Sequence, residues 1–231
     1  MLTNEQAQLW HRYEAAERAK ARKESLRALD DFIGSMSPET MEDWAPWVLK
    51  LAEDVVDHES GFPIRQPLFE KVILPALVRG VTNKEAGCAR WLAGCAQMIH
   101  SASTFKQLEG VAGPYGLLKI ALEHDPGDFL AKDMLIKLIA KDLECSIHEV
   151  PSGVINSDHN GATMAQCSEL LGDLAEFVKL TNERGVSAKY QKLIDSCSFH
   201  FMHYGIYLAV REKYADYPDY LNRLPPTIPG N

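Results

Sequence analysis

Apolar positions recur along most of this chain at spacings of three and four residues, the period of a helix that buries one face. The pattern is clearest from Ser187 to about Tyr214, in the series Tyr190, Leu193, Ile194, Cys197, Phe201, Tyr204 and Leu208. Runs of strand length that alternate apolar and polar residues are missing from the sequence. We therefore predict an all-α fold of about seven to nine helices, arranged as antiparallel hairpins in an irregular, repeat-like array.

Helix start and stop signals predict how the chain is organised. Thr3 or Asn4 can cap a long first helix over residues 3–34, which we expect to pack at the periphery. Proline removes a backbone donor, so we expect a break or a fresh start near Pro46 and a kink at Pro75. Residues 1–214 are interpreted as a single all-helical domain. The proline-rich tail, residues 215–231, is expected to pack loosely over the surface or to fray.

One segment resembles a known family of helical repeats. The run Ala121-Leu122-Glu123-His124-Asp125-Pro126, followed by Ala131 and Leu135, is similar to the junction between successive tetratricopeptide repeats. In that family one helix ends near Asp-Pro and the next begins a few residues later. Here Pro126 cannot continue the first helix, and Asp128 can cap the second. The resemblance lies mainly in residues 113–148, and it implies stacked helical hairpins and a protein-binding scaffold, with no catalytic residue.

A long polar segment, Glu149 to Gly161, interrupts the helical pattern. Connections between packed helices usually have about 2–8 residues, and longer ones are more often functional or disordered. We therefore place a candidate binding site there, made of His148, Glu149, Ser152, Asn156, Asp158 and His159. The structural alternative is ordinary loop geometry, with Pro151 and Gly153 shaping turns. Residues 148–153 are also similar to a segment of uncharacterised bacterial helical proteins, which implies no established role.

Two histidines of the last helix offer a second candidate site. His200 and His203 are three residues apart and could bind one metal ion from the same helix face, with a third ligand from the long segment. An Asp or Glu of that segment could then act as a general base. The sequence contains no His-Glu-x-x-His, Gly-x-Ser-x-Gly, phosphate-binding glycine loop or Cys-x-x-Cys motif. We therefore expect no catalytic residue and no cofactor, and keep a metal-dependent enzyme as the alternative.

Composition and charge limit the class of partner. The formal net charge is −8, which argues against a general affinity for nucleic acid and favours a basic partner. The sequence also bears on where the protein is found. No stretch approaches the roughly 20 apolar residues of a membrane span, and no signal peptide is visible at the start of the chain. The 5 cysteines are odd in number and scattered, as in proteins that keep reduced thiols. We therefore expect a cytoplasmic protein that does not bind membranes.

These patterns favour a non-enzymatic protein-binding module whose partner is unknown. One concrete form is an immunity-type inhibitor of a basic toxin, because an acidic inhibitor would gain association rate from charge complementarity. A purely structural or oligomer-forming helical protein is a third hypothesis. The sequence leaves the partner and the oligomeric state open.

Overall fold

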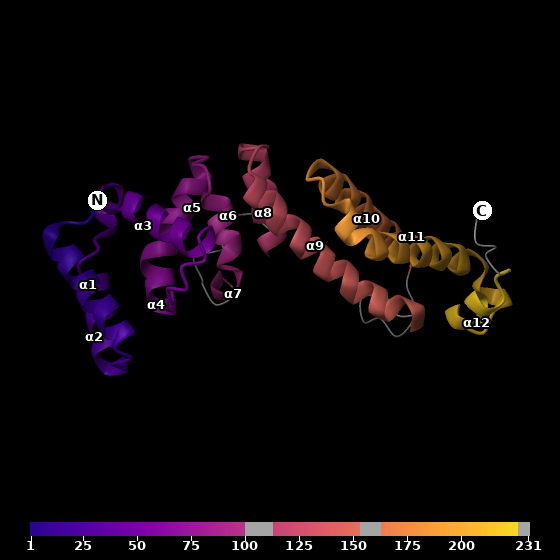
Figure 1. Cartoon of the computed structure of the whole chain (residues 1–231), viewed down its shortest axis with the longest axis horizontal. Coiled ribbons are helices and arrows are strands. Elements are labelled where there is room, and N and C mark those ends of the chain that lie inside the picture. Colours follow the sequence, from indigo (N-terminus) through magenta and orange to yellow (C-terminus); the bar gives the residue numbers. More distant parts are fainter. Residues whose placement is uncertain (100–112, 153–162, 226–231) are drawn as a thin grey trace. The chain divides into compact units, whose positions relative to one another are not determined.

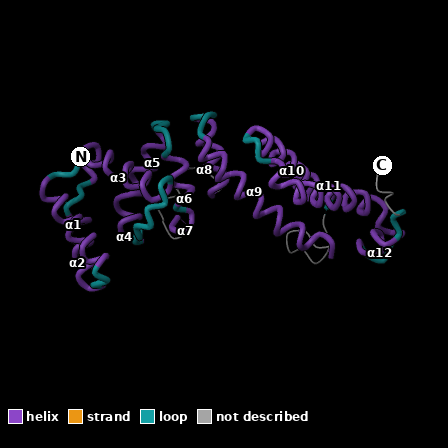
Figure 2. The backbone as a smooth tube through the Cα atoms, in the orientation of Figure 1, coloured by secondary structure: helices purple, strands orange, loops and turns teal. Residues whose placement is uncertain are grey.

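A computed structural model describes residues 1–99, 113–152 and 163–225, and these residues form an all-α fold without a β-strand (Figures 1 and 2). By its internal contacts the chain divides into two compact units, Met1–Ala131 and Lys132–Asn231. This division falls inside the segment 1–214 that the sequence assigns to a single domain. Among the described residues, no helix is both long and apolar enough to cross a membrane.

The single long helix predicted over 3–34 is wrong, because the chain reverses in the middle of it. Residues 3–34 instead form an antiparallel hairpin of two helices, α1 (Asn4–Arg18) and α2 (Arg22–Gly34). Lys20, in the turn, has a φ of 55°, in the left-handed region. The apolar anchors of this segment lie at its two ends, and the reversal brings the rings of Trp10 and Phe32 to a centroid distance of 5.1 Å. Burial of these anchors against each other favours the hairpin over a straight helix.

Proline has different effects at two positions of the first unit. Pro46 lies inside α3 (Met41–Val56), so the predicted break is wrong: one backbone hydrogen bond is lost near the start of the helix, and the helix continues. Near Pro75 the helix does change. A five-residue π-helical turn, Phe69–Ile73, joins α4 (Gln66–Leu68) to α5 (Leu74–Thr82), and Leu74 N–H donates to the carbonyl of Phe69. Proline is a common cause of such local irregularity.

Small residues set the packing of the remaining helices of the first unit, α6 (Cys88–Gly94), α7 (Ala96–Ile99) and α8 (Gly113–His124). A Cβ atom added to Gly80 of α5 would lie 2.3 Å from Sγ of Cys88. One added to Gly94 would lie 2.6 Å from a methyl group of Val56 on α3. Helix α6 therefore packs closely against both α3 and α5, with its backbone near theirs.

The second unit consists of long helices α9 (Phe129–Glu149), α10 (Met164–Glu183) and α11 (Ser187–Val210), followed by α12 (Tyr217–Asn222). Helix α9 begins in the last residues of the first unit. Its start confirms the predicted cap: α8 ends at His124, before Pro126, and Asp128 Oδ1 accepts a hydrogen bond of 2.9 Å from Ala131 N–H. Helices α10 and α11 pack together as a hairpin. A repeat-like array along the whole chain stays a prediction.

The tail prediction is wrong for the described residues of 215–231. Asp216 caps α12 by accepting a hydrogen bond of 2.7 Å from Asp219 N–H. Tyr217 and Tyr220 are buried, and their rings stack at a centroid distance of 5.9 Å. Burial of two aromatic side chains outweighs the entropy of ordering this short segment.

Candidate functional site

An acidic pocket lies between α9 and α10 in the second unit, with a volume of about 410 Å³. Four residues of each helix line it, and they share the spacing i, i+3, i+4, i+7 that places side chains on one face. They are Asp142, Cys145, Ser146 and Glu149 from α9, and Gln166, Glu169, Leu170 and Asp173 from α10. The pocket therefore has four carboxyl groups, and no lysine or arginine is among its lining residues.

Local interactions at both ends of the helix pair position these side chains. Thr163 caps α10: its hydroxyl accepts from Gln166 N–H at 3.3 Å, and its own N–H donates to Gln166 Oε1 at 2.8 Å. At the far end Arg184 donates to both carboxylate oxygens of Asp133, at 2.7 and 2.8 Å. These hydrogen bonds lower the pKa of Asp133 and raise that of Arg184. Since Asp133 is near the start of α9 and Arg184 just after the end of α10, the two helices run antiparallel.

The chemistry of the pocket is that of an anionic acceptor surface. Asp142, Glu169 and Asp173 are exposed, whereas Leu170 is buried among the lining residues. Carboxylates accept hydrogen bonds and attract lysine, arginine or an amine. Among the described residues no three His, Cys, Asp or Glu side chains come close enough together to hold a metal ion.

The structure places only part of the predicted loop site. Glu149 lines the acidic pocket, His148 is exposed beside it at the end of α9, and Ser152 is exposed in the 3-10 turn Val150–Ser152. Asn156, Asp158 and His159 lie outside the described residues.

Sequence reasoning missed the other seven pocket residues. Their signal is the polar i, i+3, i+4, i+7 face that each helix carries next to the long segment. Each face alone is indistinguishable from an ordinary solvated one, so only the pairing of the two reveals the pocket.

His200 and His203, the alternative metal ligands, each face a tyrosine of α12. Nδ1 of His200 lies 3.2 Å from the hydroxyl of Tyr217, and Nδ1 of His203 lies 3.0 Å from that of Tyr220. Burial lowers the pKa of His200, and the neighbouring charge of His203 lowers it further. Burial also raises the pKa of Tyr217. In the described structure these histidines thus belong to the aromatic contacts that hold α12 against α11.

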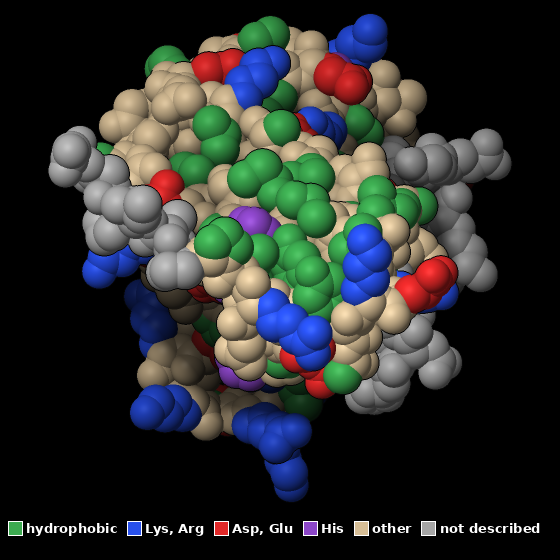
Figure 3. Space-filling model, turned by 90° about the vertical axis from the view of Figure 1, so that its right-hand side faces the viewer, with side chains coloured by type: hydrophobic (Ala, Val, Ile, Leu, Met, Phe, Trp, Pro, Cys, Tyr) green, Lys and Arg blue, Asp and Glu red, His purple; other side chains and the backbone are tan. Residues whose placement is uncertain are grey.

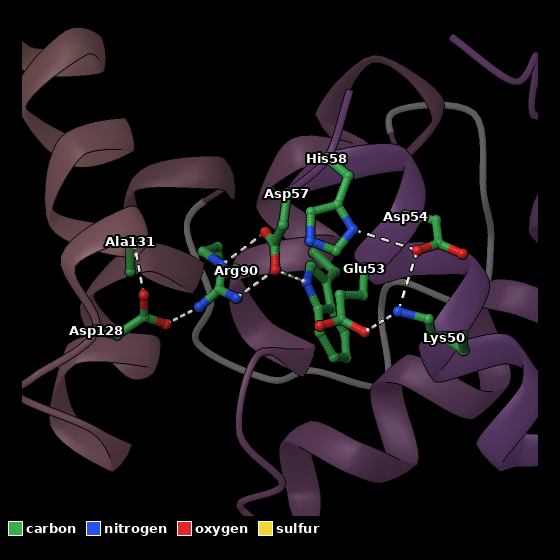
Figure 4. Close-up of polar contacts among 9 residues, drawn as sticks. Lys50, Glu53, Asp54, Asp57, His58, Arg90, Asp128 and Ala131 are labelled. Carbon is green, nitrogen blue, oxygen red and sulfur yellow. Dashed lines mark hydrogen bonds and ion pairs between the residues drawn. The ribbon is translucent and has the colours of Figure 1, made fainter. Parts of the chain in front are cut away.

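The most buried polar cluster in the described residues is an ion network of the first unit (Figure 4). Arg90 of α6 lies between two carboxylates: its Nε and Nη2 donate to Asp57 at 3.0 and 2.6 Å, and its Nη1 donates to Asp128. Trp91 Nε1 also donates to Asp57, at 2.8 Å. Burial opposes the charge of Arg90, but the hydrogen bonds to Asp57 and the charge of Asp128 outweigh it and raise the pKa of the guanidinium. We assign this network to stability, because every member is engaged by another.

Comparison with known proteins adds no relative: no family model, no curated protein and no solved structure matches this chain.

Proposed function

We propose that this chain is a non-enzymatic protein-binding module and that the acidic pocket between α9 and α10 binds a basic segment of its partner. The observation that carries the proposal is the set of four carboxyl groups on facing helix surfaces, with no lysine or arginine among the lining residues. Such a surface is complementary to lysine or arginine side chains. Glu149, the first residue of the long polar segment, is one of these four.

Charge complementarity should raise the association rate of this interaction more than its affinity. Exposed ion pairs contribute about 0.2–1 kcal/mol each, so four carboxylates alone support only modest affinity. The net charge of −8 steers a basic partner toward the chain and raises the association rate at low salt. An immunity-type inhibitor that neutralises a basic toxin in the bacterial cytoplasm is the concrete form of this proposal, because such an inhibitor must capture its toxin rapidly.

The test is an affinity capture with two variants of equal net charge. The pocket variant carries Asp142→Asn, Glu149→Gln, Glu169→Gln and Asp173→Asn. The control variant removes four exposed carboxylates of the first unit by Glu24→Gln, Asp30→Asn, Glu39→Gln and Glu59→Gln. We expect native chain and control to retain one stoichiometric basic partner that the pocket variant loses. Equal capture by all three proteins, or by none, would remove the proposal.

The immunity-type form requires one further result. Co-expression of this chain should suppress the toxicity of the captured partner, and the pocket variant should fail to do so. If the captured partner is harmless when expressed alone, the protein-binding function still stands, but the immunity-type form is contradicted.

The metal-dependent alternative gains no support from the described residues. His200 and His203 lie against tyrosine hydroxyl groups, and no third metal ligand joins them in the described structure.

A further inference from the structure

A second pocket, of about 390 Å³, lies in the first unit between α1 and α3. Its volume is within the roughly 300–1,000 Å³ that is usual for ligand pockets. The residues that line it from these helices are Ala7, Trp10 and His11 of α1, and Pro46, Trp47 and Lys50 of α3. The first two residues of the chain complete the wall, and no aspartate or glutamate is among the lining residues. We call this site the tryptophan pocket.

The two tryptophans of this pocket have unused hydrogen-bond donors. Indole N–H groups usually find an acceptor when they are buried, and those of Trp44 and Trp91 do, at 3.1 and 2.8 Å. Trp10 is 6% exposed and Trp47 is half-buried, yet neither N–H has a hydrogen-bond partner in the described structure. Among the described residues, the hydroxyl of Tyr13 is the only enclosed side-chain nitrogen or oxygen without a partner. Both indole N–H groups are therefore open to solvent.

Lys50 adds a further donor and excludes one class of ligand. Its ammonium has three N–H groups, and Glu53 and Asp54 accept two of them, at 2.9 and 3.1 Å. Tryptophan rings by themselves could bind a cation, but a lysine in the same wall repels one. The tryptophan pocket therefore suits a ligand that is apolar, carries hydrogen-bond acceptors and has no positive charge.

Proline-rich segments have this chemistry. Proline has an apolar ring and a carbonyl acceptor, and it lacks the backbone N–H donor. In the polyproline II conformation the backbone makes no internal hydrogen bonds, so each carbonyl is free to accept one from a partner. Aromatic-lined grooves bind such segments, because the rings pack against the prolines and the ligand is ordered before it binds.

The chain itself contains such a segment. Residues 225–229 read Pro-Pro-Thr-Ile-Pro, with three prolines in five residues. Polyproline II has three residues per turn and a rise of 3.1 Å, so Pro226 and Pro229 fall on one side, about 9 Å apart. Pro225 is exposed after α12, on the side of the second unit that Figure 3 faces, and residues 226–231 lie outside the described residues. The segment thus begins at the surface.

We infer that the tryptophan pocket binds a proline-rich segment in the polyproline II conformation, and that its occupant is residues 225–229 of a second copy of this chain. The proline rings cover the indole rings, and carbonyl oxygens of the segment accept from the indole N–H groups. Five residues bury far less than the roughly 1,200–2,000 Å² of stable interfaces, so the expected Kd is above about 10 μM. This contact does not depend on the function proposed above.

The first experiment measures binding of a dye-labelled peptide with the sequence of residues 224–231, by fluorescence anisotropy. The receptor is the full-length tail variant, Pro226→Ala with Pro229→Ala, whose own segment does not compete. The same two replacements in the peptide should weaken its binding at least about tenfold, because they remove two rings and the fixed φ angles.

Variants of the receptor then test the pocket. Ala7→Leu fills part of the tryptophan pocket and should weaken peptide binding at least about tenfold. Its matched control is Ala15→Leu, the same replacement at an exposed position of the same helix, which should leave the Kd unchanged. Trp47→Phe keeps an aromatic ring but removes the N–H donor, and should weaken binding about 3–10-fold. Circular dichroism shows whether each variant keeps the native helix content.

The second experiment tests the second copy as occupant, by sedimentation equilibrium of the full chain up to millimolar concentration. The native chain should self-associate, and the Ala7→Leu variant and the tail variant should each remain monomeric. Mixed in equal amounts, these two variants should form a 1:1 dimer, because the intact segment of one then meets the intact pocket of the other.

The possible contrary results separate the two parts of the inference. Equal binding of the peptide to the Ala7→Leu and Ala15→Leu receptors, or equal binding of the peptides with and without Pro226 and Pro229, would overturn the pocket assignment. A native chain that stays monomeric, or a mixture of the two variants that does not pair, would overturn the second copy as occupant.

Discussion

Removal of Arg90 is expected to destabilise the first unit more than any single surface substitution. Its side chain is 10% exposed, and the two carboxylates it joins, Asp57 and Asp128, are 7% and 8% exposed. Arg90→Met leaves both carboxylates buried and without their cation. Breaking a buried pair in this way typically costs about 3–5 kcal/mol. Since a domain of this size is stable by about 5–15 kcal/mol, the variant should lose between about a fifth and the whole of its stability.

Tryptophan fluorescence measures this loss in the first unit alone, because Trp10, Trp44, Trp47 and Trp91 all lie there. Urea unfolding of Arg90→Met is compared with Arg79→Met, which removes a more exposed ion pair with Glu42. The control should lose less than about 1 kcal/mol.

A triple variant separates buried charge from lost packing. Asp57→Asn and Asp128→Asn, added to Arg90→Met, remove the stranded charges and keep the oxygen acceptors for Trp91 and the cap of α9. This variant should recover part of the lost stability. A loss in Arg90→Met no larger than that of the Arg79 control would refute the reasoning.

Three further predictions concern single residues. Cys145 is exposed and the other cysteines are buried, so a thiol reagent should modify one thiol of the native chain and five after unfolding. Labelling of all five thiols at one rate in the native chain would contradict this. Because burial depresses the pKa of His200, the unfolded chain binds this proton more readily. Unfolding free energy should therefore fall as the pH drops through about 6.5 toward the native pKa, and His200→Gln should lack this part of the pH dependence. Gly80→Ala forces a methyl group against Cys88 and should cost about 1–3 kcal/mol in urea unfolding. Gly34→Ala, where nothing lies within 4 Å, should cost nothing.

Local signals in the sequence were sufficient for much of the fold. The apolar series through Cys197 and Phe201 predicted the buried face of α11, because a helix that packs on one side must repeat its apolar residues with the helical period. The Asp125–Pro126 pair predicted the end of α8, and Asp128 the start of α9, because both depend on single residues and their immediate neighbours.

Features that depend on distant contacts could not be predicted in this way. The turn at Lys20 contains no glycine or proline, so the sequence carries no local signal for it. The turn is favoured by burial of Trp10 against Phe32. The partners of His200 and His203 come from α12, 17 residues further along the chain, in a segment expected to be loose. The acidic pocket forms only where a face of α9 packs beside a face of α10, and the long polar segment separates these two helices in the sequence.

The position of Asp128 has a consequence for the order of folding. Starting a helix is the costly step, because the backbone of several residues must be fixed before the first hydrogen bond forms. Asp128 is held by Arg90 within the first unit, and its carboxylate caps α9, most of which belongs to the second. We therefore expect the first unit to supply the nucleus from which α9 grows. Asp128→Ala should slow the refolding of the helices of the second unit more than it accelerates their unfolding, and the reverse balance in stopped-flow circular dichroism would contradict this. On this view the chain folds in the direction in which it is synthesised.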